Sequence, residues 1–270
     1  MVSKKRSIFL WIFCVIFTIG IAYYQRVTGP SYPVSGHKNI AGRDINFKLL
    51  RTSDAEGNEK IKIQIPDTSF HGTIDFKRFK SNDAWTKSEM KQDGNMLIAE
   101  LPHQPPAGKI IYSITLRSGT DSQKLTPEPV VIRFKGDVPL YILIPHILLM
   151  FLAMLYSSRT GLEAVFNGVR TYRYTIITTI CLFLGGAILG PIVQKFAFGA
   201  YWTGWPFGHD LTDNKTLVAL LIWIVALIVQ LRNKKGRAWV IAAAIILLAV
   251  YLIPHSVLGS EIDYTQATPK

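Results

Sequence analysis

Five long apolar segments constrain the fold of this chain more than any other feature of its sequence. They cover residues 8–24, 138–156, 174–194, 216–231 and 238–258. A helix needs about 17 to 25 apolar residues to cross about 30 Å of hydrocarbon. None of the five segments carries Asp, Glu, Lys or Arg near its middle, where a charge is costly. We therefore expect five transmembrane helices.

The first segment permits two interpretations. A basic start at residues 4–6, an apolar run and small residues at Gly20 and Ala22 suit a signal peptide cleaved after Ala22. The same features suit an uncleaved membrane anchor. We favour the anchor, residues 1–29, because the apolar run continues through Tyr23 and Tyr24, an aromatic pair typical of a membrane interface.

The distribution of charge predicts how the chain crosses the membrane. Three short segments, 1–7, 157–173 and 232–237, hold ten basic residues and one acid, a net charge of +9. The 195–215 loop and the tail from 259 together carry a net charge of −1. Basic loops stay in the cytoplasm. We therefore expect a multi-pass protein of the bacterial cytoplasmic membrane, with its amino terminus inside and with residues 25–137 and the carboxyl terminus outside.

The overall composition excludes several classes of protein. The net charge of +12 is spread over both sides of the membrane, so we expect no nucleic-acid partner. The two cysteines, Cys14 and Cys181, lie in apolar segments, which excludes a disulfide framework and a cysteine-built zinc site. No hydrolase elbow, phosphate loop, metalloprotease or dinucleotide signature is present. We assign no catalytic residue, and a non-enzymatic role is favoured.

Between the first two apolar segments, residues 30–136 change to short runs of alternating apolar and polar residues. The runs are separated by turn signals and cover residues 46–50, 60–65, 72–79, 96–101, 110–116 and 130–134. In one of them Ile61, Ile63 and Ile65 are expected to point inward. This pattern predicts an antiparallel β-sandwich. The predicted fold is an α+β membrane protein, with this extracytoplasmic sandwich between helices 1 and 2.

One stretch of this segment resembles immunoglobulin-like and fibronectin-III-like modules of bacterial extracytoplasmic proteins. The resemblance covers about 35 residues and is carried by Trp85, Met90, Gly94, Leu101, Pro102, Gly108, Tyr112 and Ile114. It implies a binding fold without specifying a role. We expect Trp85 and Tyr112 to pack in the core; the alternative is that they form a ligand-binding face.

Two histidines recur in one tetrapeptide, Leu-Ile-Pro-His, at His146 and His255. Counting 1.5 Å per helical residue places both within about one helical turn in depth, near the outer face. Three interpretations remain open. The histidines are structural hydrogen-bonding groups beside a proline kink, or they ligate a haem b between helices, or they form a metal, proton-relay or quinone site.

The outer loop, residues 195–214, combines six aromatic residues with a His-Asp pair. The aromatics suit a membrane interface belt, whereas the interleaved glycines indicate a folded loop. Asp213 is a candidate N-cap of the fourth helix. The candidate ligand-binding residues here are Trp202, Trp205, His209 and Asp210.

A Trp-rich outer loop beside two histidine-bearing helices resembles the haem-handling membrane proteins of cytochrome c maturation. The resemblance implies that Trp202 and Trp205 hold a haem whose ligands are His146 and His255. Independently, both histidines need polar partners in the membrane, so we expect loop 202–209 to fold over them.

The remaining segments complete the predicted organisation. Residues 137–258 form a four-helix bundle, and residues 259–270 form an outer tail. We expect an accessory or assembly component of a membrane or envelope complex, whose sandwich binds a protein partner outside and whose helices contact the lipid bilayer. The alternative is a haem b protein for electron transfer or haem handling, built on His146 and His255.

Overall fold

The computed structural model describes residues 4–54, 56–233, 236–254 and 259–266. The chain divides into two compact units. The helical unit contains residues 1–30 and 138–259, and the β-unit contains residues 31–137 together with the tail from residue 260. The tail therefore belongs to the same compact unit as the strands.

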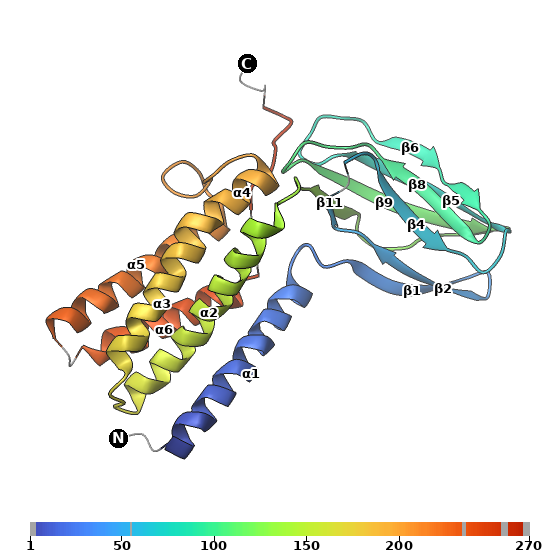
Figure 1. Ribbon diagram of the computed structural model, residues 1–270. Helices are drawn as coiled ribbons and strands as arrows, with labels where there is room; N and C mark the ends of the chain where they lie inside the picture. The colour runs from blue at the N-terminus through green and yellow to red at the C-terminus, as the bar shows by residue number, and fades with distance from the viewer. Residues whose placement is uncertain (1–3, 55, 234–235, 255–258, 267–270) are drawn as a thin grey trace. The chain divides into compact units, whose positions relative to one another are not determined.

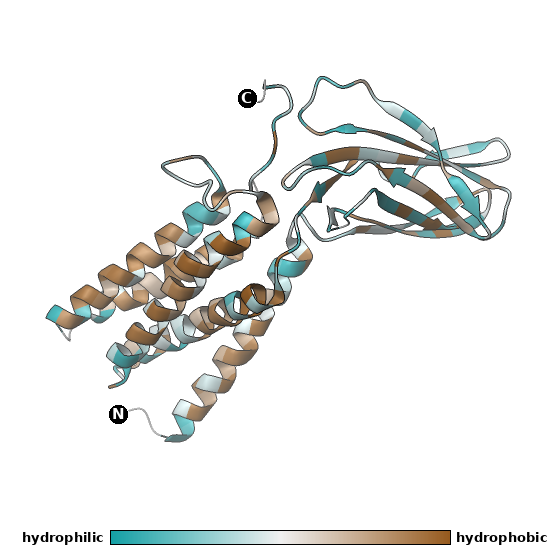
Figure 2. Cartoon of the chain, turned by 45° about the horizontal axis from the view of Figure 1, so that its top comes forward, coloured by the Kyte–Doolittle hydropathy of each residue, from teal (hydrophilic) through white to brown (hydrophobic). Residues whose placement is uncertain are grey.

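The helical unit is built from apolar helices (Figure 1). They are α1 (Lys4–Thr28), α2 (Leu140–Val165), α3 (Thr171–Leu182), the π-helical segment η1 (Phe183–Leu189), α4 (Gly190–Phe198), α5 (Leu211–Arg232) and α6 (Arg237–Leu252). Four spans among the described residues are long and apolar enough to cross a membrane: α1, α2, the continuous run from α3 to α4, and α5. The helix α6 is apolar but has only 16 residues. Figure 2 shows apolar residues along most of the length of these helices.

Small residues let the helices of this unit approach one another closely. Ala153, Ala226 and Ala243 are buried in one cluster with Trp223. A Cβ atom added to Gly161 of α2 would lie 2.8 Å from the Cβ of Ala244 on α6. Close packing of small side chains is the usual way in which membrane helices associate.

The β-unit contains two sheets and a hairpin. Its strands are β1 (Val34–Ile40), β2 (Arg43–Leu49), β3 (Thr52–Ser53), β4 (Glu59–Gln64), β5 (Phe70–Arg78), β6 (Thr86–Glu89), β7 (Lys91–Asp93), β8 (Met96–Leu101), β9 (Lys109–Ser118), β10 (Asp121–Lys124) and β11 (Val130–Phe134). One sheet has the order β3-β11-β9-β5-β6, with β10 also on β9, and the other has the order β4-β8-β7. The pairings of the described strands are antiparallel except that of β3 with β11.

Both sheets contribute to one hydrophobic core. In β4, Ile61 and Ile63 are buried and pair with Ala99 and Leu97 of β8. The alternate residues Lys60 and Lys62 face solvent. From the other sheet, Tyr112 of β9 is fully buried. All six sequence runs predicted as strands coincide with β2, β4, β5, β8, β9 and β11, and the inward direction of the isoleucines is confirmed.

The prediction that Trp85 packs in the core is wrong. Its side chain is 47% exposed, and the Lys77 ammonium lies 5.7 Å from the centre of its ring. Trp85 comes directly before β6, an edge strand whose residues are all exposed, so the ring has no second sheet to pack against. Tyr112 is a core residue as predicted, and its hydroxyl donates to the Leu50 carbonyl at 2.8 Å.

The predicted loop 157–173 is shorter than expected, because α2 continues to Val165. Arg159 and Glu163 lie on this last part of α2 as a buried ion pair, with an N–O distance of 2.6 Å. The Arg159 guanidinium lies 5.6 Å from the ring centre of Trp11 and 5.3 Å from that of Tyr174. The opposite charges cancel, so the net charge of the three basic segments stays at +9.

Candidate functional site

His146 makes a hydrogen bond within the helical unit. Its Nδ1 lies 2.9 Å from the Gly185 carbonyl oxygen in η1. Because a carbonyl oxygen only accepts, Nδ1 carries the proton. The Gly190 amide donates to the same oxygen. This geometry matches the structural interpretation of His146, with a π-helical carbonyl as the acceptor. His255 lies outside the described residues, so its approach to His146 stays a prediction.

A small cavity lies between α1, α2, α3, α5 and α6. It has a volume of about 20 Å³ and is lined by residues that include Gln25, Met150, Lys215, Thr216 and Tyr251. This space holds about one water molecule. This cavity is too small for a haem or a quinone head group, but His146 is not among its lining residues, so the haem and quinone interpretations of His146 stay predictions.

The polar groups around this cavity join the helices to one another. The Tyr251 hydroxyl donates to the Met150 carbonyl at 3.0 Å, and Gln25 donates to the Tyr251 carbonyl. Lys215 donates to the carbonyl of Ile253 at 2.8 Å. That carbonyl follows the end of α6, where carbonyls lack intrahelical donors. These contacts fix the ends of α1, α5 and α6 around α2.

The loop before α5 is held by the side chains of the first turn of that helix. The Asp213 carboxylate accepts the amides of Thr203 at 2.6 Å and Gly204 at 2.9 Å. Asp210, and not Asp213, is the N-cap of α5, because its carboxylate accepts the Thr212 amide at 2.7 Å. The prediction for Asp213 is therefore corrected: its carboxylate is used to order the loop.

The ordered loop presents its aromatic side chains outward. Trp205 is 68% exposed and Phe207 is 83% exposed. The Trp202 ring donates to the Trp205 carbonyl at 3.0 Å, and His209 is exposed beside the buried Asp210. The Trp205 and Phe207 rings are therefore largely uncovered by the described part of the chain, and the expected folding of loop 202–209 over His146 and His255 stays a prediction. Among the described residues, no group of three or more His, Cys, Asp and Glu side chains is placed to hold a metal ion.

A second candidate site lies on the β-unit, where the carboxyl-terminal tail is bound. We call it the tail site and define it by Arg78, Lys80, Gln104, Lys109 and Arg133. Residues 260–264 run along it in a pattern typical of an extended peptide. The amide of Ile262 donates to the Ala107 carbonyl at 3.3 Å, and that of Tyr264 donates to the Lys80 carbonyl at 2.9 Å.

Basic side chains hold the first part of the tail. The Glu261 carboxylate forms ion pairs with Lys109 at 2.5 Å and with Lys80. Arg133 donates to the carbonyl of Ser260. Burial lowers the pKa of Lys109, as do the neighbouring charges of Arg133 and Lys80, although its hydrogen bond to Glu261 opposes them. Burial raises the pKa of Glu261, but the two lysines outweigh it and the net pKa is lowered.

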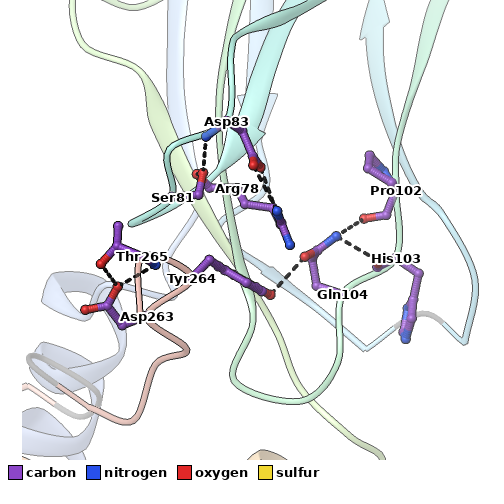
Figure 3. A network of polar contacts seen from close by, with 9 residues as sticks. All are labelled: Arg78, Ser81, Asp83, Pro102, His103, Gln104, Asp263, Tyr264 and Thr265. Carbon is purple, nitrogen blue, oxygen red and sulfur yellow. Dashed lines mark hydrogen bonds and ion pairs between the residues drawn. The ribbon is translucent and has the colours of Figure 1, made fainter. Parts of the chain in front are cut away.

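An aromatic ring anchors the second part of the tail (Figure 3). The Tyr264 hydroxyl donates to Gln104 Oε1 at 2.9 Å, and the Arg78 guanidinium lies 4.5 Å from the Tyr264 ring centre. Arg78 is oriented by two hydrogen bonds to Asp83, of 2.7 and 2.9 Å. The hydrogen bond from Arg78 also lowers the pKa of Asp83 to about 2.

Sequence reasoning did not identify the tail site. It predicted residues 259–270 as a separate outer tail. The available signal was charge: the tail holds Glu261 and Asp263, whereas the segment that forms the strands has an excess of basic residues. Charge alone, however, does not predict which basic residues bind the tail. The three that contact Glu261 and Ser260 are Lys80, Lys109 and Arg133, which lie far apart in the sequence.

Comparison of the chain with protein-family models, with curated proteins and with solved structures gives no match.

Proposed function

We propose that this protein is an accessory or assembly component of a bacterial envelope complex, which holds an immunoglobulin-like domain on the outer side of the cytoplasmic membrane. The β-unit supports such a domain, because its two sheets enclose one core. The helical unit supports the membrane anchor, because its helices are long and apolar.

The bound tail supports five crossings. The tail lies on the β-unit, so both are on the same side of the membrane. The number of crossings between residues 137 and 260 must then be even. With α2, the α3–α4 run and α5 as three crossings, α6 is the fourth. Its 16 residues extend about 24 Å, and a short helix is accommodated by local thinning of the bilayer.

The charge distribution supports the orientation. The three short segments 1–7, 157–173 and 232–237 carry the net charge of +9, which favours the cytoplasmic side for them. The helix α1 then crosses outward and remains part of the bundle. The packing of its Trp11 against Tyr156 and Tyr174, with ring centres 5.3 and 5.7 Å apart, supports an uncleaved anchor.

The observation that carries the binding role is the extended peptide held on the β-unit. A segment of this chain is bound there through main-chain amides, a carboxylate and an aromatic ring. These are the elements by which binding domains recognise extended peptides. The helical unit contributes membrane attachment, and its exposed loop aromatics Trp205 and Phe207 suit the membrane interface.

In-cell photo-crosslinking tests this role. A photoreactive residue replaces His103, which neighbours Gln104 of the tail site, and in a matched variant it replaces Lys62 on β4. We expect a discrete protein adduct from position 103 that is absent from position 62. The absence of any adduct at position 103, in a protein that reaches the membrane at normal levels, contradicts the binding role.

A further inference from the structure

We propose that the tail site is the ligand site of the β-unit. Its ligand is an acidic peptide segment of a partner protein, with a tyrosine three residues after an acidic residue. The chain's own tail occupies the site in competition with this ligand. This inference rests on the proposed binding function and specifies its ligand. The bound tail shows which chemical groups the site accepts.

The carboxylate position is set by charge. Lys80 and Lys109 both reach Glu261, and Arg133 binds the adjacent carbonyl of Ser260. Two lysines thus bind the carboxylate, and an arginine binds the carbonyl of the preceding residue. Burial and the charges of Arg133 and Lys80 lower the pKa of Lys109, while its hydrogen bond to Glu261 opposes them.

The tyrosine position is set by hydrogen bonding and space. The Gln104 amide nitrogen donates to the His103 carbonyl at 2.8 Å, and this leaves the amide oxygen free to accept from the Tyr264 hydroxyl. Gly108 provides the room, because a Cβ atom there would lie 2.8 Å from that hydroxyl oxygen. Phenylalanine would leave the oriented Gln104 oxygen without this donor, so the site favours tyrosine.

The tail is bound by contacts that a ligand can replace. The Lys80 side chain is half exposed, and ion pairs with partly exposed partners are individually weak. The tail competes mainly because it is tethered, which gives it a high effective concentration at the site. Releasing the tail should therefore increase the affinity of the site for a free peptide.

A direct test measures binding of a fluorescent peptide with the sequence of residues 259–266 to the full chain in lipid nanodiscs. Three proteins are compared: the wild type, a tail-release variant (Glu261→Gln with Tyr264→Ala), and that variant with Lys80→Gln and Lys109→Gln added. We expect the tail-release variant to bind at least about tenfold more tightly than the wild type, and the added lysine changes to reverse this gain.

Matched controls separate site binding from general attraction to a basic surface. Lys62→Gln with Lys91→Gln removes two exposed lysines of β4 and β7 from the tail-release variant and should leave binding unchanged. Peptides with Gln in place of the glutamate, or with Phe in place of the tyrosine, should bind more weakly. Unchanged melting of the variants shows that the β-unit is folded.

Three results overturn the inference. The first is equal peptide binding with and without Lys80 and Lys109, and the second is the absence of binding to the folded tail-release variant. The third is capture of the tail by a second, differently tagged copy in place of its own β-unit. The first two results would leave the photo-crosslinked adduct at position 103 unaffected. The proposed binding function would then stand, and only the identity of the ligand would be wrong.

Discussion

The buried pair Arg159–Glu163 provides a sharp test of how the helical unit is held together. Its side chains are 1% and 3% exposed, so each charge depends on its partner and on the surrounding rings for stabilisation. Removing one partner of a buried ion pair costs about 3–5 kcal/mol, because the remaining charge is left uncompensated. We expect a loss of this size for Glu163→Leu and for Arg159→Met.

The double variant should behave differently from either single variant. Replacing a buried ion pair with apolar residues of similar volume is often neutral or stabilising. The variant with Arg159→Met and Glu163→Leu should therefore lie within about 1 kcal/mol of the wild type. With about 3–5 kcal/mol lost by each single variant, the coupling energy between the two positions is then at least about 5 kcal/mol, larger than that of an exposed i, i+4 pair at about 0.5 kcal/mol.

The ring contacts predict a smaller, separate effect. Trp11 reaches the guanidinium from α1, and a cation–π contact of this kind contributes about 0.5–2 kcal/mol. Trp11→Leu should lower stability by an amount in that range in the wild type. In the variant that already carries Arg159→Met, the loss should shrink.

The free energy of unfolding of the full chain can be measured in mixed micelles of sodium dodecyl sulfate and a non-ionic detergent, followed by circular dichroism. Arg173→Met, at an exposed position on α3, is a control that removes a charge without breaking a buried pair. If Glu163→Leu unfolds like the wild type, or if the double variant is as unstable as either single variant, the two charges are not buried together as described.

Three further predictions concern the β-unit, the tail and the cofactor. Trp85→Ala should lower stability by about 1 kcal/mol or less, because the ring is half exposed. Tyr112→Phe should cost about 1–3 kcal/mol, because it removes the hydrogen bond from the buried ring to the partly buried Leu50 carbonyl, and thermal melts compare the two variants. Docking of the tail lowers the pKa of Glu261, so the stabilisation that Glu261 gives to docking is complete above the ordinary glutamate pKa of about 4.3. It is lost as the pH falls through the lowered pKa of the docked state, and a fluorescent label on the tail should therefore report release in acid. Release with rising pH between 5 and about 8 would contradict this. If His146 is a structural residue that donates to the Gly185 carbonyl, the purified protein should show no Soret band, and a Soret band abolished by His146→Ala would contradict that interpretation.

Local sequence patterns predicted the regular elements well. Alternation in residues 60–65 predicted the buried face of β4, because the side-chain period of a strand is fixed by backbone geometry. Runs of apolar residues predicted the helices for a similar reason. Trp85 was misplaced because burial of an aromatic residue depends on whether its strand is central or at an edge, which local pattern does not specify.

Features that depend on tertiary pairing could not be predicted. Arg159 and Glu163 were assigned to a loop because charges are normally excluded from membrane helices, and their mutual pairing overrides that rule. Asp210 and Asp213 both precede or begin a helix, and only the contact of Asp213 with Thr203 and Gly204 shows which one caps α5. The tail site joins Glu261 to bases more than 120 residues away.

The central claim is that the β-unit and the bound tail lie together on the outer side of the membrane. Cysteines replacing Gln104 and Tyr264, whose side chains are 2.9 Å apart, can be joined by a short thiol cross-linker that does not enter cells. Cleavage at a protease site introduced between α5 and α6 separates the two halves of the chain unless the cross-linker joins them. In the control protein the two cysteines replace Lys62 and Tyr264. We predict efficient linkage of positions 104 and 264 in intact spheroplasts and none in the control protein. Linkage that requires permeabilised membranes, or its absence when each single cysteine reacts from outside, would contradict the claim.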